Sequence, residues 1–229
     1  MNRIKPLLLA NSLHGFSLHA KDGPIGKIDD FYFSDQDWKV RHVVIEIDHW
    51  LDMRKVLVSP SNLGSTDWRK KHITADLTRE QISRSPDSET VLPVALQIDR
   101  RVNAITGEGM HWPETYWSMP VGVDSATDRT DGNYDAHLRS TRILRDIEVD
   151  AEDGSPLGRI ADFLIDTHCW EIPLLMIKAH DGRVFISHPD IVTSIDVGRR
   201  TAASDITQKE NAEWMEYDPH YMAIMSTTE

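Results

Sequence analysis

The sequence predicts a mainly β protein made of two tandem small β-barrels, each followed by a short helix and joined by an irregular connector rich in proline, glycine and aromatic residues. Three observations support this fold class. One long motif occurs twice at a nearly constant spacing. Short stretches of alternating apolar and polar residues are separated by turn signals at intervals of roughly ten residues. A helix-start signal follows each set of predicted strands.

The duplication is visible in the ranges Asp22–Phe33 and Asp153–Ile165. Gly26 and Gly158 are 132 positions apart, and the same spacing joins further identical pairs: Ile28 and Ile160, Asp30 and Asp162, Phe31 and Phe163, Trp38 and Trp170. A repeat of this length has the size of a domain and not of a solenoid unit. We therefore expect two copies of one small domain.

The predicted strands of the first copy are short and separated by turns: Phe16–Ala20, Ile28–Phe33, Val40–Asp48, Lys55–Val58 and His72–Ala75. Gly26, near the start of the second strand, indicates a bulge or a close backbone approach. The second copy repeats the pattern, with a hairpin signal at Asp181-Gly182. Short antiparallel strands of this kind favour a small barrel that closes on itself and removes its edges.

A capping box, Thr78 with Gln81, predicts a short helix after the first barrel, and Thr207–Glu210 stands in the same place after the second. These signals set the domain boundaries. The first repeat with its helix spans residues 1–82, the connector spans 83–135, and the second repeat with a C-terminal helix and tail spans 136–229.

The composition restricts the classes of partner. The net charge is −12 and the pI about 5.3, which makes nucleic acid an unfavourable partner because nonspecific binding depends on neutralising phosphates. The single cysteine, Cys169, excludes an intrachain disulfide and fits a reducing, cytoplasmic location. No apolar run approaches the ~20 residues of a membrane-spanning helix. We expect membrane association only at the periphery, through a partner.

The repeated motif, together with Lys55–Pro60 and Asp76–Pro86, resembles the PRC-barrel family. This family shares a domain with the cytoplasmic part of the photosynthetic reaction-centre H subunit and with the C-terminal domain of RimM ribosome-maturation proteins. The aromatic stretch Trp112–Trp117 is similar to one in two-barrel bacterial members. The resemblance implies closed barrels and a scaffold or assembly role without a shared catalytic site. The chain departs from the family pattern at Pro173 and at Asn211–Glu213.

The sequence motifs assign no catalytic residue, no cofactor and no metal site. Gly-x-Ser-x-Gly, His-x-x-x-His and Cys-x-x-Cys are all absent from the sequence. Asp29, Asp30 and Asp162 on the predicted strands allow a proton-relay interpretation, because acidic residues conduct protons in the H subunit. We favour the alternative that these side chains face solvent or hold turns.

Four aromatic residues are the candidate contacts for a protein partner: Trp50, Trp112, Tyr116 and Trp117. Large aromatic side chains dominate interface energetics. The alternative for the connector aromatics is packing against a barrel, and Trp50 in a hairpin tip is the better contact candidate. Trp38 and Trp170 are expected in the core or at its rim.

The sequence therefore predicts a non-enzymatic protein-binding or scaffold module, for which a membrane or electron-transfer complex is one candidate assembly. One alternative is a factor associated with the ribosome or with RNA processing, and a weaker one is a module that handles protons or quinones. The partner itself is not identified by any motif, and a homodimer is a further alternative because two docked barrels can pair with a second chain.

Overall fold

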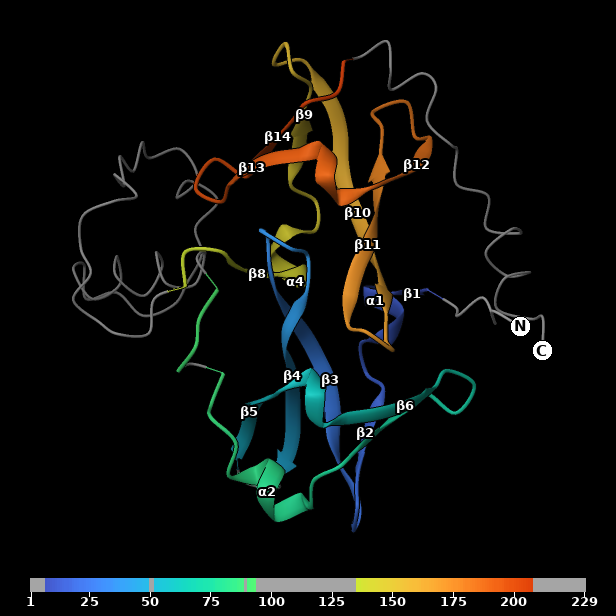
Figure 1. Cartoon of the computed structure of the whole chain (residues 1–229), viewed down its shortest axis with the longest axis vertical. Helices are drawn as coiled ribbons and strands as arrows, with labels where there is room; N and C mark the ends of the chain where they lie inside the picture. Colours follow the sequence, from blue (N-terminus) through green and yellow to red (C-terminus); the bar gives the residue numbers. More distant parts are fainter. Residues whose placement is uncertain (1–6, 50–51, 89, 94–134, 208–229) are drawn as a thin grey trace.

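The computed structural model describes residues 7–49, 52–88, 90–93 and 135–207, and the structural statements below concern these residues. They form two β-sheets, one for each sequence repeat. The sheets lie end to end along the long axis of the molecule, with the first repeat in the lower half of Figure 1 and the second in the upper half. The mainly β character predicted from the sequence is confirmed.

The two sheets have the same strand order, β5-β4-β3-β2-β7-β6 in the first repeat and β12-β11-β10-β9-β14-β13 in the second. The strands of the first are β2 (Ser17–Ala20), β3 (Gly23–Ser34), β4 (Val40–His49), β5 (Asp52–Val58), β6 (Leu63–Asp67) and β7 (His72–Ala75). Those of the second are β9 (Glu148–Asp150), β10 (Pro156–Asp166), β11 (Glu171–Lys178), β12 (Val184–Ser187), β13 (Val192–Asp196) and β14 (Thr201–Ser204).

Closure into a barrel, which the sequence predicts, is not found among the pairings of the described strands. The first sheet ends at β5 and β6, and the second at β12 and β13. In each case the chain passes between these two edges through a 3-10 turn, η1 (Pro60–Asn62) or η3 (Pro189–Ile191). Each turn begins with a proline, which has no N–H to donate to a ladder, so a corner interrupts the pairing there.

Three short helices accompany the sheets in the described ranges: α1 (Ala10–Leu13), α2 (Arg79–Ser83) and α4 (Thr141–Leu144). The capping box that starts α2 is confirmed, because Gln81 N donates to Thr78 Oγ1 at 3.2 Å and Thr78 N donates to Gln81 Oε1 at 2.8 Å. The matching helix predicted at Thr207–Glu210 falls, beyond Thr207, outside the described residues. None of these helices has the length and apolar character needed to cross a membrane.

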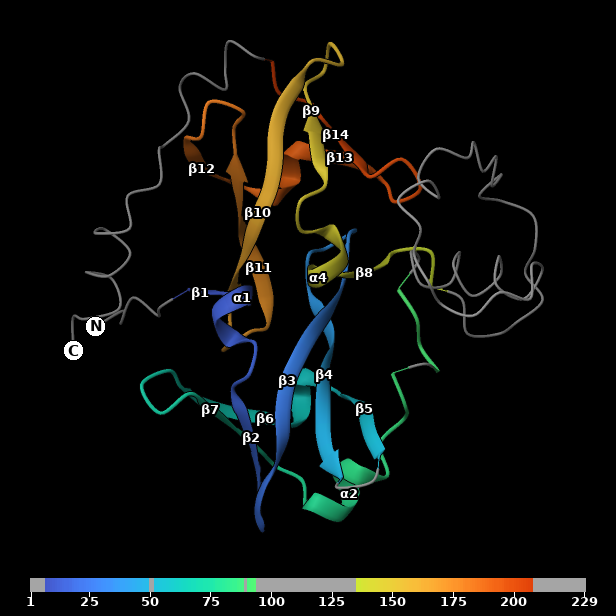
Figure 2. The same cartoon turned by 180° about the vertical axis from the view of Figure 1, so that it is seen from behind.

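The repeats exchange their first strands. β1 (Leu8–Leu9) pairs with β10 of the second repeat, and β8 (Leu138–Ser140) pairs with β3 of the first. The helix that follows each exchanged strand therefore also lies against the other repeat: Figure 2 shows α1 beside β10 and β11, and α4 beside the ends of β3 and β4. The exchange is reciprocal, which ties the two sheets into one body.

One hydrophobic core runs through both repeats. Phe33 lies between Trp38 and Phe163, with ring centroids 5.3 and 5.6 Å apart, so aromatic packing crosses the junction. Trp38 and Trp170 are both buried and both have positive φ, 53° and 58°. Their carbonyl oxygens accept reciprocal hydrogen bonds, from Ile172 N to Trp38 O and from Val40 N to Trp170 O, each 2.8 Å. Both tryptophans thus belong to the core.

The repeated glycines mark a close backbone approach, as predicted. A Cβ at Gly26 would overlap the carbonyl oxygen of Glu46 on β4, and one at Gly158 would overlap that of Lys178 on β11. Each glycine lets its long strand cross tightly against the next strand, which curves the sheet. Gly158 also has φ +153°, a backbone conformation that other residues rarely adopt.

Candidate functional site

The four aromatic residues predicted to contact a partner, Trp50, Trp112, Tyr116 and Trp117, lie outside the described residues. Their role remains a prediction. Within the described ranges, the buried carboxyl groups and the clefts lined by polar side chains lie at the junction of the two repeats, where each exchanged helix meets the other sheet. This junction is the candidate functional site.

Asp30 of β3 anchors the first side of the junction. Its side chain is 6% exposed. The carboxyl group accepts hydrogen bonds from Ser140 Oγ, from Thr141 Oγ1 at 2.9 Å, from Arg142 N at 3.2 Å and from Phe31 N at 2.7 Å. Burial raises the pKa of Asp30, and these hydrogen bonds act in the opposite direction. An acid of the first repeat therefore caps α4 of the second.

Asp162 of β10 occupies the corresponding position on the other side. It accepts hydrogen bonds from Phe163 N at 2.8 Å and from Asn11 N, the second residue of α1, at 3.2 Å. Burial again raises the pKa of this carboxyl. The expectation that Asp30 and Asp162 face solvent or hold turns is wrong. Both side chains are buried, and each accepts a hydrogen bond from a free backbone N–H at the start of a helix.

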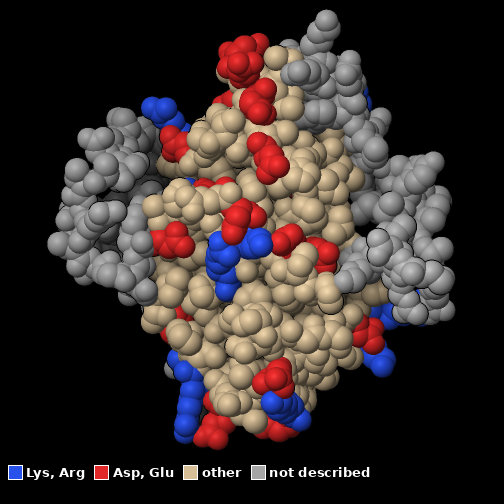
Figure 3. Space-filling view, in the orientation of Figure 1, with Lys and Arg blue, Asp and Glu red and all other residues tan. Residues whose placement is uncertain are grey.

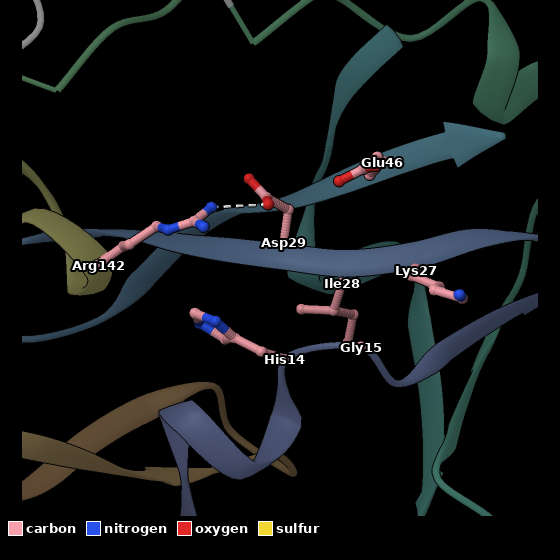
Figure 4. A pocket seen from close by; sticks show the side chains of 7 residues that line it. All are labelled: His14, Gly15, Lys27, Ile28, Asp29, Glu46 and Arg142. Carbon is pink, nitrogen blue, oxygen red and sulfur yellow. Dashed lines mark hydrogen bonds and ion pairs between the residues drawn. The ribbon is translucent and has the colours of Figure 1, made fainter. Parts of the chain in front are cut away.

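A cleft of about 250 Å³ opens at the Asp30 side of the junction (Figure 4). Asp29 lies at its edge between two cations, with Oδ2 2.8 Å from Lys55 Nζ and Oδ1 2.8 Å from Arg142 Nη1. Figure 4 shows Arg142 reaching from α4 to Asp29 on β3. The full lining is His14, Gly15, Lys27, Ile28, Asp29, Glu46 and Arg142.

His14, at the end of α1, adds an uncharged group to this cleft. Its pKa is lowered, first by burial and then by the positive charges of Arg145 and Arg142, while Asp29 acts in the opposite direction. Its Nε2 atom is buried and has no hydrogen-bond partner in the described part of the chain. A neutral imidazole between paired charges suits polar recognition more than proton transfer, which needs a connected acid and base.

A second cleft, of about 240 Å³, lies on the other side of the junction, next to the turn between β6 and β7. Its lining combines one apolar and one aromatic side chain with hydroxyl and acidic groups: Leu8, Gly64, Ser65, Thr66, Trp68, Asp166, Thr167 and His168. At the place corresponding to Leu8, the other side of the junction has Arg139, whose Nη2 is 2.6 Å from Asp35 Oδ2 in a nearly buried ion pair. The corresponding positions on the two sides of the junction therefore carry an apolar side chain, Leu8, and an ion-paired one, Arg139.

Metal and thiol chemistry find little support in the described ranges. No group of three or more His, Cys, Asp or Glu residues there is arranged to hold a metal ion. Cys169 is exposed, but its pKa is raised by desolvation and by the neighbouring Asp166, which disfavours the reactive thiolate.

Comparison with protein-family models and with curated protein sequences gave no match. The junction itself was not foreseen from the sequence. The signal that could have indicated it is Ser140-Thr141, a pair of residue types that favours a helix start, placed directly before a short apolar stretch. Its acidic partner is 110 residues away, and nothing local to Ser140 points to that distance.

Proposed function

We propose that this chain is a non-enzymatic protein-binding or scaffold module of the PRC-barrel type, working in the cytoplasm as part of a larger assembly, such as a membrane or electron-transfer complex. PRC-barrel membership is part of this proposal and rests on the repeated motif with its corner and capping signals.

The observation that supports this function best is the way the junction uses its buried polar groups. Asp30 and Asp162 are the two buried carboxylates, among the described residues, that would be strongest candidates for chemistry. Both are engaged as caps for the helix of the opposite repeat. These bonds stiffen a two-repeat body, and what is left for recognition is its surface. Rigid bodies with charged, accessible surfaces bind partners with little ordering cost.

The surface is suited to selective rather than general electrostatic binding. In the view of Figure 3, acidic and basic side chains are interspersed, and acidic ones predominate. Ion pairs such as Lys39–Glu171 and Arg41–Asp37 neutralise neighbouring charges. A broad phosphate-binding face is therefore unfavourable, which weakens the ribosomal or RNA-processing alternative.

Affinity capture with the full chain, from cells that make it, tests the proposal. The expected result is a stoichiometric protein partner that is retained at ~0.15 M salt. The Trp112→Ala/Tyr116→Ala/Trp117→Ala variant is captured in parallel with the wild type. A loss of the partner in this variant would assign the contact to the predicted connector aromatics. Recovery of no partner would reject the proposal, and turnover of a small molecule by the purified chain would replace it by an enzymatic function. Co-sedimentation with ribosomes would replace it by the alternative.

A further inference from the structure

The turn between β6 and β7 is the most distinctive exposed feature in the described part of the chain. It comprises Trp68, Arg69, Lys70 and Lys71, and we name it the Trp68 tip. In Figure 1 it projects as a loop from the right side of the lower repeat. Trp68 is 36% exposed and is the one large hydrophobic side chain classed as exposed among the described residues.

Contacts within the Trp68 tip stabilise its conformation. Lys70 N donates to Asp67 Oδ1 at 3.0 Å, and Lys71 adopts a positive φ of 52°. The Arg69 guanidinium lies 5.4 Å from the centre of the Trp68 ring, within the range of a cation–π interaction. An aromatic ring and a cation are thus presented together, with part of their ordering already accomplished before any partner binds.

The second repeat provides an internal reference for this tip. The turn between β13 and β14 has the same backbone design, because Arg199 N donates to Asp196 Oδ1 at 2.9 Å and Arg200 has φ 56°. It also ends in two basic residues, Arg199 and Arg200. The place of Trp68, however, is taken by Val197, which is only 8% exposed. The two turns project from opposite sides of the molecule (Figure 1).

We propose that the Trp68 tip is the docking surface for an acidic segment of a protein partner. This inference rests on the proposed protein-binding function and specifies its surface. Three basic residues in sequence form a local positive charge in a chain of net charge −12. They outnumber the two acids beside them, Asp67, which pairs with Lys70 at 3.7 Å, and Asp166, which lines the same cleft as Trp68. Exposed tryptophan and arginine are the residue types that most often supply the central binding energy of an interface. The cleft beside Trp68 adds hydroxyl groups for polar contacts.

An acidic protein fits this surface better than an anionic membrane does. The two basic turns project from opposite sides of the molecule, so a flat bilayer that meets one tip end-on faces away from the other. The strongly negative chain as a whole is repelled by an anionic lipid surface. A protein segment approaches the tip locally, where complementary charge increases the association rate and the selectivity.

The test uses the full chain and a fluorescein-labelled oligo-glutamate peptide with one central phenylalanine, followed by fluorescence anisotropy. We expect binding that weakens as salt is raised above ~0.15 M. The Lys70→Glu/Lys71→Glu variant should bind roughly tenfold more weakly or worse, and Trp68→Ala should lose a similar amount. The control Arg199→Glu/Arg200→Glu makes the same charge change on the turn without the tryptophan and should change binding less than about twofold.

Two results would overturn the inference: no binding of the peptide by the wild-type chain, or equal losses in the two charge-reversal variants. Binding of phosphatidylserine vesicles that depends on Lys70 and Lys71 and is not displaced by the peptide would replace the protein partner by a membrane. In affinity capture, a partner that the Lys70→Glu/Lys71→Glu variant retains would leave the proposed function intact and reject only the Trp68 tip. Failure to capture any partner would reject the proposed function itself.

Discussion

The two sides of the repeat junction share one backbone design but hold their exchanged helix in different ways. At the first side, Asp30 accepts from the Ser140 and Thr141 hydroxyls as well as from the backbone of α4. At the second side, Leu9 and Ala10 stand in place of those two residues, so Asp162 receives a single bond from α1, through Asn11 N. A duplicated site can therefore keep its geometry while one copy carries most of the polar anchoring.

The largest expected effect in this comparison comes from removing the two acids separately. Asp30→Ala leaves two buried hydroxyls and the backbone N–H groups of Arg142 and Phe31 without this acceptor, and should lower the free energy of unfolding by about 2–4 kcal/mol. Asp162→Ala removes one cross-repeat bond and should cost about 1–2 kcal/mol. Urea denaturation of both variants measures the difference. Equal losses would show that the extra hydroxyl bonds contribute nothing.

The two close-approach glycines provide a second comparison. An added methyl group overlaps a carbonyl oxygen at either position, so Gly26→Ala should cost about 1–3 kcal/mol. Gly158→Ala should cost roughly 1 kcal/mol more, because its positive φ adds backbone strain to the overlap. Thermal unfolding of the pair tests this order, with Gly154→Ala as a reference that has positive φ but no close neighbour. A larger loss at Gly26 would contradict it.

The pH dependence of stability tests whether burial dominates at both acids. Burial raises the folded-state pKa of Asp30 and of Asp162, so the folded protein binds protons more tightly than the unfolded chain does. The contribution of each acid to stability is therefore greatest below the unfolded pKa of about 4 and declines as the pH rises through the folded pKa.

Relative to Asp30→Asn, the wild type should thus lose stability with rising pH, by at most about 1.4 kcal/mol per pH unit, and then level off. Asp162→Asn should reveal the same direction of change over its own range. Urea denaturation at a series of pH values, from acid to neutral, measures both. A wild type that gains stability over this range relative to the variants would mean that the hydrogen bonds outweigh burial.

The smallest expected effect concerns Asp29, whose position in the second repeat is held by Ala161. Asp29→Ala removes the ion pairs with Lys55 and Arg142, two side chains that are 41% and 55% exposed. Solvent screens such pairs, so the free energy of unfolding should fall by less than about 1 kcal/mol. A larger loss would show that Asp29, like Asp30, holds α4 in place.

The sequence was sufficient for the features that depend on local pattern. The repeat spacing, the alternation in β2 and β4, the close approach at Gly26 and the capping box at Thr78 were all visible in neighbouring residues. Barrel closure was overpredicted, since hydrophobic alternation fixes which face of a strand is buried but not which edges pair across a proline corner.

The junction could not be predicted for a different reason. The pairing of β1 with β10 and of β8 with β3 joins residues more than 100 positions apart, and neither two- to three-residue strand has a pattern of its own. The same limitation applied to Trp68, which lies between the predicted strands Lys55–Val58 and His72–Ala75, where exposure depends on what packs beside it. The aromatics Trp50, Trp112, Tyr116 and Trp117 remain predictions for partner contact.

Strand exchange also affects the order in which the chain can mature during synthesis. Leu8 and Leu9 leave the ribosome early, yet their pairing partners, Ile165 and Leu164, are made only after more than two-thirds of the chain. The amino-terminal half consequently emerges with β1 unpaired and with its own sheet still lacking β8, which is translated later. Nascent chains of this protein should stay susceptible to proteases until β10 has appeared, and then become resistant in a single late step.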